Sequence, residues 1–133
     1  MKSMKQELTI CTVSFNSASC LELNWLLVNR FNSELNYSWI VVENSDANSD
    51  ERLPPENQKF ITVEGVACTR TRARGSYHHA AGLNRALELV TSRYVLFLDP
   101  DFFIIRQDWI NEMLEHMQAN QLSFFGVPYH PAR

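Results

Sequence analysis

Two carboxylates, Asp99 and Asp101, are the strongest candidates for chemistry in this chain of 133 residues. They follow a very apolar run and flank Pro100, whose ring fixes φ and stiffens the turn between them. Mg²⁺ and Mn²⁺ prefer oxygen ligands, and Mg²⁺ is commonly shared between one or two carboxylates and substrate phosphates. The alternative is a plain β-turn, since Asp and Pro are common turn residues. Because the pair ends a predicted core strand, we favour a metal site.

Three arginines, Arg70, Arg72 and Arg74, lie within five residues of each other in a segment without apolar periodicity. A guanidinium group suits phosphate because it binds through paired N–H donors in a planar fork. A solvated basic loop is the alternative for any single arginine. We expect at least one of the three to contact a diphosphate or a base.

Other polar residues offer weaker candidates. Glu43 ends a predicted strand and could accept hydrogen bonds from a ribose or a pyrimidine imide, with capping of the following loop as the alternative. His78 and His79 could bind metal or phosphate, but adjacent side chains diverge on a helix, so we expect them to be local structure. His116 is expected on the surface.

The elements that position these residues follow from apolar spacing. Runs rich in β-branched and apolar residues predict five strands, at residues 8–14, 37–43, 60–64, 93–98 and 122–127. Helical spacing predicts three helices, over about residues 20–30, from residue 76 or 77 to about 90, and from Asp108 onward. This β-α-β-β-α-β-α-β order predicts an α/β fold with a mostly parallel sheet flanked by helices. Ligands of such sheets bind beyond the carboxyl ends of the strands.

Helix ends and faces can also be predicted. Ser19 and Glu22 form a capping-box pattern at the start of the first helix, and Asp108 is a candidate cap for the last. The second helix is expected to bury a face that includes Ala80, Leu83, Leu87 and Val90, with Ala86 beside it, and the third a stripe that includes Ile110, Met113, Leu114 and Met117.

Composition excludes several classes of protein. With 45% hydrophobic and 20% charged residues the chain is a normal globular domain, and its net charge of −3 gives no support to nucleic-acid binding. Three cysteines without a CxxC pair make a disulfide framework or structural zinc site unexpected and favour a reducing cytoplasm. The apolar stretch after residue 6 is too short for a signal peptide or a membrane span. The chain lacks the motifs of P-loop kinases, Rossmann dehydrogenases and α/β-hydrolases.

Four blocks of the sequence resemble the family 2 glycosyltransferases of the GT-A fold, in that family's order. They cover residues 12–16 (TVSFN), 41–45 (VVENS), 79–87 (HAAGLNRAL) and 96–101 (LFLDPD). The resemblance implies a Rossmann-like, GT-A-type sheet and, over residues 1–133, a single nucleotide-sugar-binding domain. We expect a cytoplasmic enzyme, with a peripheral position at the membrane as the alternative.

The resemblance also implies roles for individual residues. The activity would be metal-dependent, inverting transfer of a sugar from a nucleoside-diphosphate sugar to a hydroxyl of a saccharide, lipid or protein acceptor. Asp99 and Asp101 would hold Mg²⁺ or Mn²⁺, which neutralises the leaving diphosphate. The donor would be bound by Val13 and Phe15 around the base, by Glu43, by the loop arginines Arg70, Arg72 and Arg74, and by Asn84 and Asp99.

The chain departs from the family in two ways. The family usually has Asp where this chain has Glu43, and members continue into an acceptor-binding half that supplies the general base. We therefore expect a fragment, or a short member that relies on a partner, with self-association through an exposed sheet edge. The alternative is a non-catalytic nucleotide-sugar-binding or assembly module. A sugar-phosphate nucleotidyltransferase is less favoured because residues 15–18 lack glycine.

Overall fold

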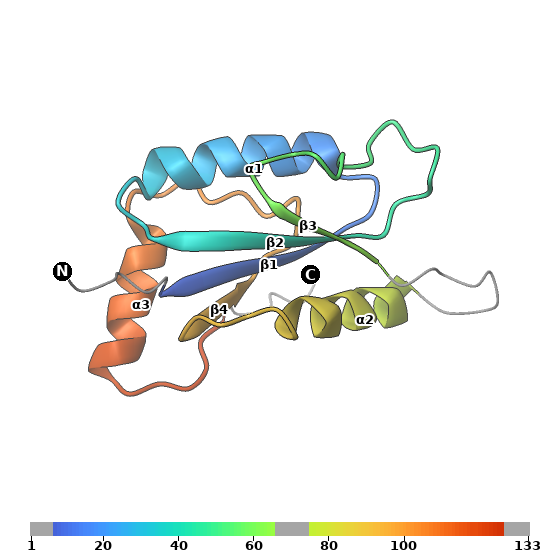
Figure 1. The fold of residues 1–133 in the computed structure, drawn as a ribbon. Coiled ribbons are helices and arrows are strands. Elements are labelled where there is room, and N and C mark those ends of the chain that lie inside the picture. The colour runs from blue at the N-terminus through green and yellow to red at the C-terminus, as the bar shows by residue number, and fades with distance from the viewer. Residues whose placement is uncertain (1–6, 66–74, 127–133) are drawn as a thin grey trace, which may run out of the picture.

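The apolar runs of the sequence pair into one parallel sheet in a computed structural model, which describes residues 7–65 and 75–126 (Figure 1). In chain order the elements are β1 (Leu8–Ser14), α1 (Ala18–Phe31), β2 (Tyr37–Glu43), β3 (Ile61–Glu64), α2 (Gly75–Leu87), β4 (Tyr94–Phe97) and α3 (Trp109–Ala119). The strand order is β3-β2-β1-β4, and every pairing is parallel. The predicted α/β fold is therefore confirmed. All four strands end at one edge, called here the carboxyl edge.

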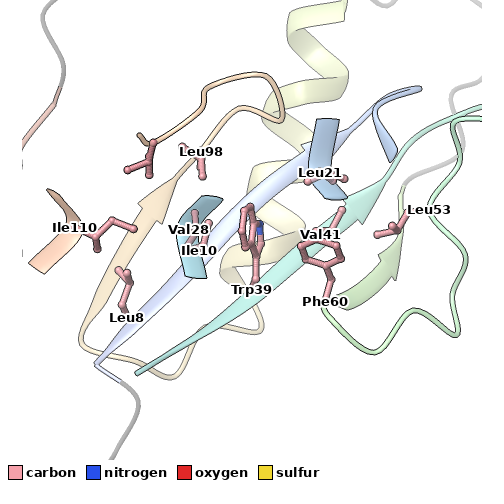
Figure 2. Packing of buried hydrophobic residues seen from close by; sticks show 11 residues of the cluster. Leu8, Ile10, Leu21, Val28, Trp39, Val41, Leu53, Phe60, Leu98 and Ile110 are labelled. Carbon is pink, nitrogen blue, oxygen red and sulfur yellow. The ribbon is translucent and has the colours of Figure 1, made fainter. Parts of the chain in front are cut away.

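Alternate residues of β1 and β2 enter two hydrophobic clusters on opposite faces of the sheet, as the pleat requires. Figure 2 shows the larger cluster, in which Trp39 lies edge-on to Phe60 with ring centroids 5.2 Å apart. That cluster joins Leu8, Ile10, Trp39 and Val41 to Leu21 and Val28 of α1 and Ile110 of α3. The smaller one joins Cys11, Val13, Ile40 and Val42 to Ala86 of α2. Helices α1 and α2 thus cover opposite faces (Figure 1).

Helix α2 approaches the sheet closely through Gly82. A Cβ atom at this position would lie 2.6 Å from Cγ2 of Val13, closer than two carbon atoms can pack. The buried face of α2 is Gly82 and Ala86, whereas Ala80 and Leu87 are exposed. The predicted face was therefore wrong for Ala80 and Leu87. The helix packs closest at Gly82, and a pattern of apolar side chains does not identify a glycine as buried.

The predicted capping box at Ser19 and Glu22 is also wrong. Helix α1 begins at Ala18, so Ser19 lies inside its first turn. The carboxylate of Glu51 accepts hydrogen bonds from the Ser19 amide at 2.8 Å and from its hydroxyl at 2.7 Å. Glu22 instead pairs with Lys59 and accepts from Asn57. The hydrogen bonds at the start of α1 are therefore accepted by a residue of a distant loop rather than by a side chain of the capping box.

Asp108 precedes α3 as predicted but does not cap it with its side chain. Its backbone is left-handed, with φ at 56°, and Oδ1 of the buried Asn32 accepts from the Ile110 amide at 3.1 Å instead. Of the predicted stripe, Ile110 is buried and Met113, Leu114 and Met117 are half-buried.

The predicted strand at residues 122–127 is wrong over its described part, since residues 122–126 form no strand. Gln121 turns the chain with φ at 52°, and Phe124 remains 85% exposed. An apolar run becomes a strand only where a neighbouring edge accepts its hydrogen bonds.

In the described ranges, the helices are all too short or too polar to cross a bilayer.

Candidate functional site

Asp99 and Asp101 lie in a tight turn at the carboxyl edge. The Phe102 amide donates to the Asp99 carbonyl at 3.1 Å, so the four residues 99–102 form a β-turn with Pro100 second, a favoured place for proline. The Asp99 side chain is 68% exposed and Asp101 is also exposed. In the described part of the chain neither carboxylate pairs with Lys or Arg. The turn leaves both carboxylates available to a cation.

Two buried polar side chains hold this turn in place. Thr12 Oγ1 accepts from Trp39 Nε1 at 3.0 Å and donates to the Leu98 carbonyl at 2.7 Å, which ties the end of β4 to β1 and β2. Asn24 Nδ2 of α1 donates to the Phe102 carbonyl at 3.0 Å. Sequence reasoning missed both residues, although each is a polar residue with an apolar residue on either side in the sequence.

A groove of about 750 Å³ runs beside β4. Its walls are mainly apolar residues of β4, α3 and residues 123–126, and Asp99 lies among them. Asp101 is not part of this lining. The groove therefore meets the turn of residues 99–102 at Asp99.

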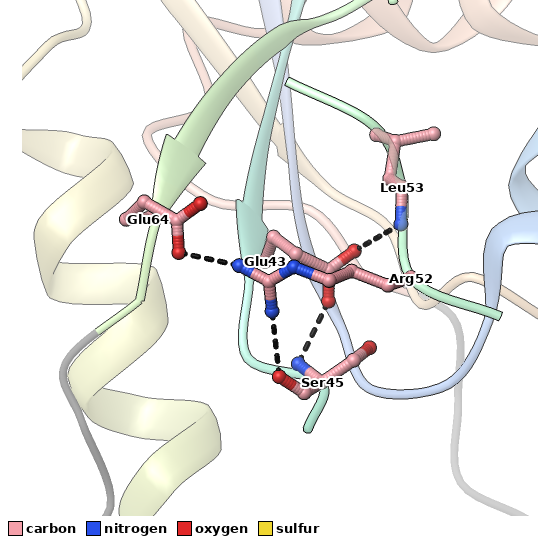
Figure 3. Close-up of polar contacts among 5 residues, drawn as sticks. All are labelled: Glu43, Ser45, Arg52, Leu53 and Glu64. Carbon is pink, nitrogen blue, oxygen red and sulfur yellow. Dashed lines mark hydrogen bonds and ion pairs between the residues drawn. The ribbon is translucent and has the colours of Figure 1, made fainter. Parts of the chain in front are cut away.

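Glu43 is buried and directed into the loop that follows β2 (Figure 3). Its Oε1 accepts from the Ser45 amide and its Oε2 from the Leu53 amide, both at 2.7 Å. Arg52 completes the network by donating to the Ser45 carbonyl at 2.7 Å and to Glu64 at 2.6 Å. The loop-capping role is thus present in the structure, because the Glu43 carboxylate reaches both amides.

The other predicted donor-binding residues are spread over different surfaces. Phe15, 59% exposed, follows β1 at the carboxyl edge, whereas Val13 is only 7% exposed and packs under α2. Asn84 is exposed on α2, nearly opposite its buried face at Gly82 and Ala86. The predicted Arg70, Arg72 and Arg74 lie outside the described residues.

The imidazole of His79 reaches the turn of residues 99–102, called here the carboxylate turn. His79 Nε2 of α2 lies 3.8 Å from Asp99 Oδ1. His78 instead has an edge-on ring contact with Tyr77, at 5.8 Å between centroids. In the described ranges, no three His, Cys, Asp or Glu side chains are grouped closely enough to hold a metal ion by themselves.

A comparison with curated proteins finds no match. The family model for glycosyl transferase family 2 matches residues 9–132, which is nearly the whole chain and includes every element of the sheet except the first residue of β1. The chain therefore belongs to glycosyl transferase family 2, whose members transfer glycosyl groups from activated sugar donors to acceptors.

Proposed function

We propose that this chain supplies the donor site for metal-dependent, inverting transfer of a sugar from a nucleoside-diphosphate sugar to an acceptor hydroxyl. The observation that supports this most strongly is the turn of residues 99–102, which presents two exposed carboxylates at the carboxyl edge on a buried polar support. Open parallel sheets bind ligands at this edge.

The donor set fits a hard divalent cation such as Mg²⁺ or Mn²⁺. Asp99 and Asp101 provide two carboxylates, and Mg²⁺ typically takes one or two carboxylates together with phosphate oxygens and water. A site of this kind has no need of three grouped protein ligands. When bound, the cation would neutralise charge on the departing nucleoside diphosphate.

The chain's own residues would orient the donor. Phe15 offers an exposed aromatic ring to the base beside β1. Glu43 would act on the nucleotide chiefly by fixing the loop of residues 44–53, because both of its oxygens already accept backbone amides. Val13 and Asn84 stay as predicted contacts, and so do Arg70, Arg72 and Arg74. No general base is assigned among the described residues.

Calorimetric titration with UDP, GDP and dTDP, with and without Mn²⁺, tests the proposal. We expect binding of at least one nucleotide that depends on the metal. Asp101→Ala should weaken it at least about tenfold, a loss typical of disturbing even the outer shell of a metal site. Glu34→Ala is the control, since Glu34 is an exposed carboxylate just before β2, at the opposite end of that strand from the site. Failure of a folded sample to bind any of the three nucleotides would contradict the proposal.

Turnover separates this proposal from a non-catalytic binding module. Both bind the nucleotide, but only an enzyme cleaves the glycosidic bond of the donor. Release of nucleoside diphosphate from a sugar nucleotide in the presence of Mn²⁺ is the discriminating measurement, with Asp101→Ala as the blank.

A further inference from the structure

His79 lies next to the carboxylate turn in space, although it is distant from the turn in the sequence. Its Nε2 atom faces Asp99 Oδ1 at 3.8 Å, and the two side chains remain 44% and 68% exposed. A ligand approaching Asp99 from solvent would therefore meet the imidazole as well.

The position of His79 is fixed by two contacts of helix α2 with the sheet and its loop. Asn44 Nδ2, just beyond β2, donates to the His78 carbonyl at 3.3 Å. One turn later Gly82 brings α2 against Val13 of β1. His79 lies three residues before Gly82, on the same side of the helix, so these two contacts hold its Cα beside the carboxyl edge.

The separation of the two atoms has a chemical meaning. At 3.8 Å it exceeds the roughly 3.2 Å limit of an N–H···O hydrogen bond. Two metal bonds of about 2.1 Å each, one to nitrogen and one to oxygen, span up to about 4.2 Å, so one ion can bridge the pair without moving the backbone.

We propose that His79 is a ligand of the cation that the proposed function places at Asp99, and that it makes the site prefer Mn²⁺ to Mg²⁺. The inference rests on that proposed function. Both ions prefer oxygen ligands, but Mn²⁺ is a first-row transition metal and accepts an imidazole nitrogen more readily than Mg²⁺, which retains its waters. The chain thus contributes the His79 nitrogen and the Asp99 carboxylate to this ion, and phosphate oxygens and water complete the shell.

Electron spin echo spectroscopy of Mn²⁺ bound with whichever of UDP, GDP and dTDP binds in the titration tests this directly, because it detects ¹⁴N coordinated to the ion. We expect a histidine nitrogen signal in the unmodified chain. It should vanish in His79→Ala and persist in His78→Ala, the matched control on the neighbouring residue. Calorimetry should show Mn²⁺ affinity falling at least about tenfold in His79→Ala, with Mg²⁺ affinity nearly unchanged.

Two failures can be told apart. If Mn²⁺ and nucleotide bind but the nitrogen signal is absent, or survives in His79→Ala, the assignment of His79 is overturned while the proposed function stands. If none of UDP, GDP and dTDP binds with Mn²⁺ to the folded chain, the ligand role fails together with the function on which it rests.

Discussion

At the scale of single residues, the structure separates carboxylates that hold the fold from carboxylates that face solvent. Glu43 is 2% exposed and satisfies two backbone amides, whereas Asp99 and Asp101 extend into water. All three lie at or just beyond the carboxyl end of a strand, so their positions in the sequence alone do not distinguish them. Burial with partners indicates a structural role, and exposure at the carboxyl edge leaves a group available for a ligand.

Replacing Glu43 with Gln should destabilise the chain by about 1–3 kcal/mol, the cost of leaving a buried backbone N–H without an acceptor. The amide has only one accepting oxygen, and its NH₂ group would face the Ser45 or the Leu53 amide. Glu64→Gln is the control, because Glu64 is exposed and its ion pair with Arg52 should contribute at most about 1 kcal/mol. Urea unfolding measures both, and equal losses would argue against the buried cap.

At the scale of elements, the site depends on how α1 and α2 meet the strands. Asn24 of α1 holds the turn of residues 99–102 from one face of the sheet. Gly82 of α2 lets the helix approach Val13 on the other face and brings His79 to Asp99. Both helices are therefore positioning elements for the carboxylates as well as covers for the core.

Gly82→Ala should destabilise the chain even though alanine favours helix by about 1 kcal/mol. The added methyl group would meet Val13 Cγ2 at 2.6 Å, and overpacking of this kind costs about 1–3 kcal/mol. In the double variant with Val13→Ala, which removes the clashing atoms, the penalty of Gly82→Ala should largely disappear. A double-mutant cycle in urea measures this coupling, and strictly additive effects would show that the contact is not tight.

At the scale of the whole molecule, the described residues leave the outer edge of β4 apolar and without a strand partner. In the described ranges β4 pairs only with β1, so its outer edge offers backbone groups without strand partners. Phe97 on β4 is 51% exposed, and Phe124 beside the same groove is 85% exposed. Unprotected edges of this kind favour association with another chain.

We therefore predict that the 133-residue chain self-associates as its concentration rises. Phe97→Lys should shift the equilibrium toward monomer, because it places a charge on the edge strand and also in the lining of the apolar groove beside it. Ile61→Lys is matched to it, since Ile61 is also 51% exposed but lies on β3, at the opposite edge of the sheet. Sedimentation velocity over a range of concentrations measures the oligomeric state of the chain and of both variants. A monomer at every concentration, or equal effects of both variants, would refute the prediction.

The sequence by itself determined the class of fold, the bounds of β1 and β2, and the turn that carries Asp99 and Asp101. These features depend on local information, namely apolar runs, their spacing and the residues that break them. Four short blocks in a fixed order also sufficed to indicate the family.

Only the tertiary structure decided which segments meet. In the folded chain Glu43 accepts from the Ser45 and Leu53 amides, and Glu51 accepts from the Ser19 amide at the start of α1. Residues 122–126 have no strand partner among the described residues. The fold also sets His79 beside Asp99. The physical reason is that a polar group or an apolar run takes its role from whichever neighbour satisfies its hydrogen bonds or covers its surface. In a parallel sheet those neighbours come from distant parts of the chain.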